Sequence, residues 1–272
     1  MTSLGWIASV VSSSYYARTR NSALPVAMLF LACALSYTRA QAGAAAATTP
    51  GHPISSARDL ITALRSSEPA AQKAGKAALD RAEPAMIEEL LRYGRSQGQR
   101  EAAQMAVARM GPKAVPALLA LLKLPELRNR AGAALFQAAG PASADHTPAL
   151  LDCLHDPAVN NYCGMTLVKI MGPKTAGRVP ALTEVLKDAD KTVRLYAAAA
   201  LGQIGPNAKG AVPALILALK DPEPAVRLNA AQALGKIGRG AKEAAPALKI
   251  MAQDQSVPLK NAAKEALKKI NG

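Results

Sequence analysis

The chain has 272 residues, of which 50% are hydrophobic and only 3% aromatic, and its formal net charge is +14. A positive charge of this size favours acidic partners, nucleic acid or anionic membrane surfaces. However, the lysines are scattered with no run of five, and aromatic side chains that could stack on bases are almost absent after Tyr93. These features argue against nucleic-acid binding and leave an anionic polymer or membrane surface as an open alternative.

The first 42 residues differ from the rest of the chain, because they contain three arginines but no acidic residue. Between the arginines lies an apolar run, residues 23–35, which is short for a membrane span but has the length of a signal-peptide core. The small-x-small pattern Ala40-Gln41-Ala42 follows. The sequence therefore predicts a cleaved signal peptide over residues 1–42 and an extracytoplasmic (periplasmic or secreted) protein. An uncleaved membrane anchor is the alternative, and a lipoprotein at Cys33 fits the pattern less well.

Residues 43–52 (GAAAATTPGH) predict a flexible linker, and residues 53–272 form the main domain. Without the signal peptide the chain keeps 30 basic and 19 acidic residues, a formal charge of +11.

Prolines recur along this domain with a nearly constant spacing. They are Pro53, Pro84, Pro116, Pro148, Pro180, Pro213 and Pro246, separated by 31, 32, 32, 32, 33 and 33 residues. A fixed period in this range is the signature of a stacked repeat array.

Within one period the apolar residues have helical spacing twice. In the unit of Pro213, the second segment places Val226, Ala230, Leu234 and Ile237 on one face of a helix. Since one pair of such helices cannot bury its own apolar face, each must stack on its neighbours. The sequence predicts an all-α protein, a right-handed α-solenoid of about seven helix pairs over residues 53–272.

The residues predicted to begin and end the helices of each unit agree with this pattern. Pro213 suits the first turn of a helix, where its missing N–H costs nothing. Asp221-Pro222 is predicted to end the first helix and to cap the second. Gly238 is predicted to close the second helix in the left-handed C′ conformation.

The units repeat the sequence motifs V-P-A-L, L-K-D, V-R and A-A-x-A-L-G-x-I-G, most clearly over residues 116–238. These motifs resemble HEAT repeats of the PBS-lyase HEAT-like (armadillo-type) family. The resemblance implies a scaffold for protein–protein interaction. It leaves open an enzyme or enzyme subunit of the phycobilin-lyase-like or hydroxylase-like kind. Neither an oligomeric state nor a cofactor is predicted.

The resemblance also assigns roles to polar residues. In HEAT-type arrays an acid–base pair six residues apart forms a ladder between units, and here these pairs are Asp188 and Arg194, Asp221 and Arg227, and Asp254 and Lys260. A basic stripe gripping an anionic partner is the alternative. The second helices of such arrays usually line the concave side, which implies that the partner contacts Arg128, Asn161, Tyr196, Asn229, Gln232 and Lys236. Among these, Tyr196 is predicted to be either the interface anchor, as exposed tyrosines often are, or a packing residue between repeats.

Catalytic and metal-binding patterns are missing from the sequence. None of the three histidines, His52, His146 and His155, belongs to a metal-binding pair at helical spacing, so no metal site is predicted. Cys153 and Cys163 fall late in one predicted helix and early in the next, where they either form a disulfide or stay as separate buried thiols.

Overall fold

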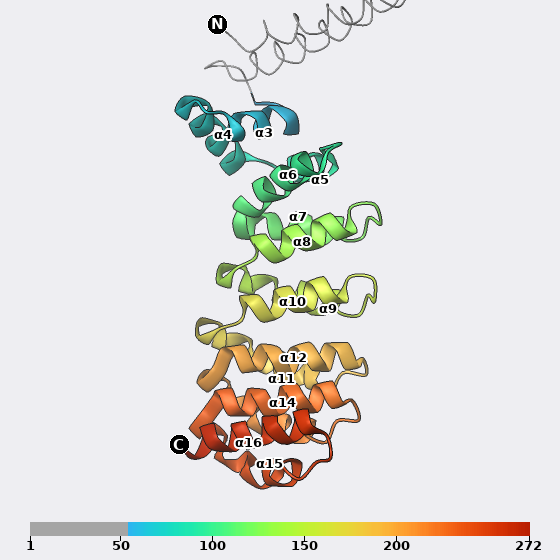
Figure 1. The fold of residues 1–272 in the computed structure, drawn as a ribbon, viewed down its shortest axis with the longest axis vertical. Coiled ribbons are helices and arrows are strands. Elements are labelled where there is room, and N and C mark those ends of the chain that lie inside the picture. The colour runs from blue at the N-terminus through green and yellow to red at the C-terminus, as the bar shows by residue number, and fades with distance from the viewer. Residues whose placement is uncertain (1–53) are drawn as a thin grey trace, which may run out of the picture.

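The computed structural model describes residues 54–272, so the predicted signal peptide (residues 1–42) and linker (residues 43–52) lie outside the described residues (Figure 1). The described chain forms seven successive helix pairs and no strand. The pairs are α3 (Ala57–Arg65) with α4 (Pro69–Arg81), α5 (Pro84–Arg92) with α6 (Gln97–Arg109), α7 (Val115–Leu121) with α8 (Arg128–Ala138), α9 (Thr147–Cys153) with α10 (Asn160–Ile170), α11 (Val179–Glu184) with α12 (Lys191–Ile204), α13 (Val212–Ala218) with α14 (Pro224–Ile237), and α15 (Ala245–Met251) with α16 (Val257–Asn271). The predicted all-α solenoid is confirmed.

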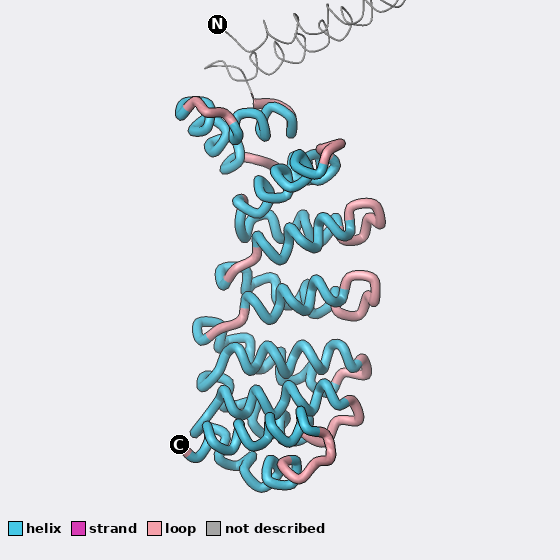
Figure 2. The backbone as a smooth tube through the Cα atoms, viewed as in Figure 1, coloured by secondary structure: helices cyan, strands magenta, loops and turns pink. Residues whose placement is uncertain are grey.

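Two kinds of connection join the helices, and they lie at opposite edges of the stack (Figure 2). Loops of a few residues join the two helices of a unit. Short 3₁₀ helices lead into the next unit from α6 onward, namely η1 (Gly111–Ala114), η2 (Pro141–His146), η3 (Pro173–Arg178), η5 (Gly205–Ala211) and η6 (Gly238–Ala244), while η4 (Val185–Lys187) extends α11. We call these two sides the hairpin edge and the connection edge.

The second helices pack directly on one another from α6 to α16. Their buried faces are rich in alanine, and Leu201 and Leu234 occupy equivalent, fully buried positions in α12 and α14. Alanine permits close approach of the helix axes, while the leucines bury the apolar area that stabilises each unit against its neighbour.

The helix boundaries agree with the predicted capping residues, except that the predicted roles of Gly238 and Asp221 need correction. Pro213 lies in the first turn of α13, as expected. Gly238 ends α14 with φ of 68°, but its ψ of −134° lies outside the left-handed helical region, in a conformation that glycine adopts without a steric penalty. Asp221 does not cap α14: the N-cap residue is Glu223, and Asp221 instead accepts a hydrogen bond from its N–H at 2.9 Å.

Candidate interaction surface

The second helices share one register, which lets their outward residues be compared. In each second helix we call the buried residue in its first turn, or directly before it, position 1. The residues at position 1 of α8, α10, α12, α14 and α16 are, in that order, Leu127, Val159, Val193, Val226 and Leu259. Positions 1, 5 and 9 point into the core, and positions 3, 4, 7 and 11 are the more exposed ones in α8 to α14. These outward positions of α8, α10, α12 and α14 form the second-helix face.

The four helices that carry this face contain no acidic residue. They contain seven basic residues, Arg128, Arg130, Lys169, Lys191, Arg194, Arg227 and Lys236. Three of the seven, Arg130, Lys169 and Lys236, are at the outward positions, so the second-helix face carries three basic residues and no acidic residue over four consecutive units.

Tyr196, the predicted interface anchor, is engaged within the protein. Its ring covers Gly164 of the preceding unit so closely that a Cβ added there would lie 2.2 Å from the ring. Its hydroxyl donates to the Oδ1 atom of Asn161 at 3.2 Å, and burial raises the pKa of the tyrosine. Tyr162 repeats both contacts one unit earlier, on Gly132 and Asn129. The structure thus places Tyr196 and Asn161 in a packing motif between units.

The four other predicted contact residues divide into two groups. Arg128 and Asn229 donate to backbone carbonyls of their own unit, Leu122 at 3.3 Å and Ala225 at 2.9 Å. Gln232 and Lys236 are exposed, and neither has a side-chain hydrogen bond within residues 54–272. Of the six, these two have side chains that remain available to a partner.

Two exposed methionines on the second helices were missed by the sequence analysis. Met105 in α6 and Met165 in α10 are 55% and 48% exposed. Met165 is at position 7, the position of Gln232 in α14, and Met105 is at the equivalent place in α6. An apolar residue in a helical repeat is normally assigned to the core, and only alignment of the units in one register would have shown that these point outward.

The predicted ladder is present as one complete rung. Arg194 donates to both carboxylate oxygens of Asp221 in the next unit, at 2.7 and 3.0 Å, and to the carbonyl of Asp188 at 2.8 Å. Arg227 donates to the carbonyls of Asp221 and Pro222, and within residues 54–272 it has no carboxylate partner. The six-residue spacing therefore reflects an arginine that binds the end of the preceding helix in its own unit.

The Arg194–Asp221 pair is nearly buried, since the two side chains are 13% and 8% exposed. Burial acts to raise the pKa of Asp221, but the hydrogen bonds from Arg194 and from the Glu223 N–H outweigh it, so this pKa is lowered. The hydrogen bond to Asp221 raises the pKa of Arg194 against the effect of desolvation. The pair is therefore held in its charged form.

The three ladder aspartates and Asp156 share a role in the hairpin loops. Asp156, Asp188, Asp221 and Asp254 each accept a hydrogen bond from the N–H two residues further on, at 2.7–2.9 Å. This is the Asx turn, in which a side chain replaces a backbone acceptor and fixes a tight loop. Lys260, the last predicted ladder residue, has no ion pair among the described residues.

Within residues 54–272, the histidines and cysteines lie in the fourth unit or in η2 immediately before it, and His52 lies outside the described residues. The Nε2 atom of His155 is 3.2 Å from the carboxylate of Asp188, and this hydrogen bond raises the pKa of His155. Across residues 54–272, no three His, Cys, Asp or Glu side chains gather in a way that could hold a metal ion. Cys153 and Cys163 are paired as a disulfide with their Cα atoms 6.0 Å apart, joining α9 to α10.

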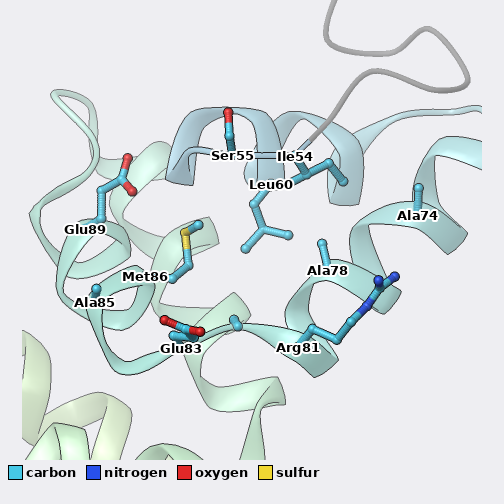
Figure 3. Close-up of a pocket in the computed structure, with 11 residues that line it drawn as sticks. Ile54, Ser55, Leu60, Ala74, Ala78, Arg81, Glu83, Ala85, Met86 and Glu89 are labelled. Carbon is cyan, nitrogen blue, oxygen red and sulfur yellow. The ribbon is translucent and has the colours of Figure 1, made fainter.

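A pocket opens between α3, α4 and α5 at the N-terminal end of the described chain (Figure 3). Its volume is about 630 Å³, and Leu60, Ala78 and Met86 line its apolar part. Glu89, on its rim, accepts a hydrogen bond from the Ala57 N–H at 3.0 Å. The lining contains no histidine or cysteine, and its polar residues are Ser55, Arg81, Glu83 and Glu89.

Within the part of the chain that the structure describes, no helix is long and apolar enough to cross a membrane.

The repeating helix pairs define an α-solenoid repeat protein. Residues 179–268, the last three units, match the family model for HEAT repeats. These three units are therefore HEAT-type repeats. No curated protein matched the chain.

Three solved structures illustrate the similarity of fold. A HEAT-like repeats protein from the archaeon Thermococcus onnurineus NA1 is 13% identical, with 81% of this chain and 98% of that chain covered and a TM-score of 0.48. A designed armadillo repeat protein in complex with the peptide (KR)4 is 18% identical, with 69% and 99% covered and a TM-score of 0.47. Human deoxyhypusine hydroxylase is 20% identical, with 89% and 99% covered and a TM-score of 0.38. Similarity at this level assigns no function.

Proposed function

We propose that this protein is an extracytoplasmic scaffold that binds a partner protein across the second-helix face. The observation that carries the proposal is the composition of that face. The second helices of four consecutive units, α8, α10, α12 and α14, contain no acidic residue. It exposes Met165, Gln232 and Lys236 together with small alanines. A methionine adapts its shape to an apolar partner surface, and depletion of acidic residues is typical of interface cores.

The architecture supports a binding role. From α6 onward, each unit contributes one second helix to a continuous layer (Figure 1), so the surface is long and repetitive. Such extended surfaces are the ones that solenoid proteins use for recognition.

The test is affinity capture with the tagged full-length chain from an envelope extract, followed by titration of the captured protein in purified form. Met165→Asp should weaken binding by about tenfold or more, because a carboxylate would be buried without a partner at the contact. Leu217→Asp is the matched control, since Leu217 is an exposed apolar residue of a first helix, 69% exposed. Binding lost in the control and kept in Met165→Asp would move the contact to the first helices.

The extracytoplasmic location rests on the sequence of residues 1–42 and needs its own measurement. Fractionation of cells that express the tagged chain should place it outside the cytoplasm, and N-terminal sequencing should begin near Gly43. A chain that stays in the cytoplasm with its N-terminus intact would refute the location and leave the binding surface unaffected.

A further inference from the structure

Basic residues gather along the connection edge in the C-terminal half of the solenoid. The set comprises Lys169, Lys174, Arg178, Lys209, Lys236, Arg239, Lys242, Lys268 and Lys269, and over the same 3₁₀ helices and helix ends Glu243 is the one acidic residue. We call this set the basic row. It lies on η3, η5 and η6 and on the last turns of α10, α14 and α16.

The basic row is continuous in space. The 3₁₀ helices η3, η5 and η6 pack one on the next. The Cβ atom of Lys209 lies 3.5 Å from the place that a Cβ would occupy at Gly240 of the following unit. The side chain of Lys236 lies 3.6 Å from the equivalent place at Gly202 of the preceding unit. The backbone segments that carry the basic row therefore lie beside one another from unit to unit.

Little in the protein neutralises this row. Among residues 54–272, Arg178 is the one member with an ion pair to a side chain, that of Asp145. Lys169 donates to the carbonyl of Phe136, and Arg239 donates to the carbonyl of Gly272. The acidic residues near the helix pairs lie mostly at the hairpin edge, where the aspartates of the Asx turns are already bound to backbone N–H groups. The opposite signs of charge are thus separated by the length of a helix, and the connection edge has an unbalanced positive potential.

The basic row overlaps the edge of the second-helix face at Lys169 and Lys236, which are at position 11 of α10 and α14. Gln232 and Lys236 are four residues apart in α14, as are Met165 and Lys169 in α10, so in each helix the two side chains are neighbours on one face. A chain that covers position 7 with apolar side chains can therefore direct other side chains toward the basic row.

The spacing of the row matches one extended polypeptide. Packed helices lie about 8–10 Å apart, and a polyproline II chain brings every third residue to the same side at intervals of about 9.3 Å. A carboxylate at every third residue would meet one unit after another. A single file of charges matches one chain better than it matches a membrane, which is a broad plane, and the scarcity of aromatic side chains gives nucleotide bases nothing to stack on.

From these observations we infer that the basic row binds an acidic, extended segment of the partner protein, with a carboxylate at about every third residue. This inference rests on the proposed function, because it describes the chemistry of the partner at the border of the same surface. The charge–charge attraction would orient the partner and speed its association.

The probe is a fluorescent peptide of about five Glu-Pro-Leu triplets, whose prolines favour the polyproline II conformation. Its binding to the full-length chain is measured by fluorescence anisotropy at low ionic strength and at about 0.15 M salt. Peptides in which Lys or Gln replaces each Glu test the sign of the charge. A single-stranded oligonucleotide and a sulfated oligosaccharide of equal charge, and vesicles of anionic lipid, test the other kinds of polyanion.

The matched variants change the same number of charges at opposite edges. Lys209→Glu, Lys236→Glu and Lys242→Glu together remove positive charge from the basic row. The control set, Lys123→Glu, Lys220→Glu and Lys249→Glu, lies outside it, and all six lysines are exposed. We expect the first set to weaken binding of the Glu peptide by about tenfold or more and the control set by less than about twofold. Circular dichroism confirms that both variants are folded.

Three results would overturn the inference. The first is an equal loss of binding in the two sets of variants, which would indicate a general effect of net charge. The second is the absence of any preference for the Glu peptide over the Lys and Gln peptides. The third is tighter binding of another polyanion than of the Glu peptide. If Met165→Asp abolishes partner binding while the basic-row variants leave it intact, the inference fails and the proposed function stands. If the basic-row variants abolish binding of the peptide and Met165→Asp leaves partner binding intact, the proposed function fails at the second-helix face.

Discussion

Individual glycines determine how closely neighbouring second helices approach. Gly132 and Gly164 each lie beneath a tyrosine ring of the next unit, whereas Ala198, at the same position in α12, lies where the next unit has Asn229 in place of tyrosine. The tyrosine and the glycine beneath it therefore occur together as a packing pair. The Asn161 side chain, which accepts the hydrogen bond from Tyr196, completes it.

We predict that Gly164→Ala destabilises the protein by about 1–3 kcal/mol, because the new methyl group would overlap the Tyr196 ring. The control is Gly98→Ala in α6. A Cβ there meets no atom within 4 Å, so the variant should gain about 0.5–1 kcal/mol from helix propensity. Urea unfolding of both variants checks this. Equal effects of the two substitutions would show that the ring does not rest on Gly164 in solution.

The cysteines allow a second test at this scale. Because Cys153 and Cys163 are paired, denatured protein purified without reductant should show no free thiol from either residue. After reduction, both should react with a thiol reagent in a mass-spectrometric assay. Two free thiols before reduction would return these residues to the alternative of separate buried thiols.

At the scale of elements, the hairpin loops and the arginine rung connect α12 to the next unit. Asp221→Asn keeps an oxygen that can form the Asx turn but loses the charge that Arg194 needs. We expect it to lower the free energy of unfolding by about 1.5–3 kcal/mol, the range for hydrogen bonds to charged groups. Asp254→Asn is the control, because Asp254 forms the same turn without an ion pair among the described residues. A similar loss in both variants would assign the effect to the turn.

The pH dependence of this element has a defined sign. The pKa of Asp221 is lowered in the folded protein, so its carboxylate contributes stability above the unfolded pKa, about 3.9. That stability is lost as the pH falls through the lower, folded pKa. The stability of the wild-type protein should therefore decrease below about pH 4 more steeply than that of Asp221→Asn. Urea titrations over the acidic range measure the difference, and parallel curves would contradict it.

At the scale of the whole molecule, each unit is stabilised mainly by its neighbours. Leu234 is fully buried, and Leu234→Ala should cost about 2–5 kcal/mol through lost burial and a cavity. Hydrogen exchange should show the loss of protection in α12 to α16 and much less in α6 and α8. Uniform loss along the chain would mean that the solenoid unfolds as one cooperative body. An unchanged urea midpoint would contradict the register of the buried positions.

The repeat period, the helix pairs and the buried leucines could be predicted from the sequence, because they follow from spacing within one unit. The inter-unit role of Arg194 was implied by the family resemblance, but its partner Asp221 and the packing role of Tyr196 could not be derived from the sequence. Their partners, Gly164, Asn161 and Asp221, are 27 to 35 residues away, and the choice between packing and partner binding depends on how one unit lies on the next. Comparison of the units in one register would have shown that tyrosine accompanies glycine.

The change from tyrosine on glycine to alanine on glycine along the stack has a mechanical consequence. In the C-terminal units, a Cβ added at Gly235 would lie 2.9 Å from the Cα of Ala266, whereas in the central units an aromatic ring separates the helices. Direct contact between backbones resists bending, but a ring held by one hydrogen bond can tilt. The stiffness of the solenoid should therefore be lower between α8 and α12 than in the C-terminal units. Under tension along its axis, the molecule should extend first between α8 and α12.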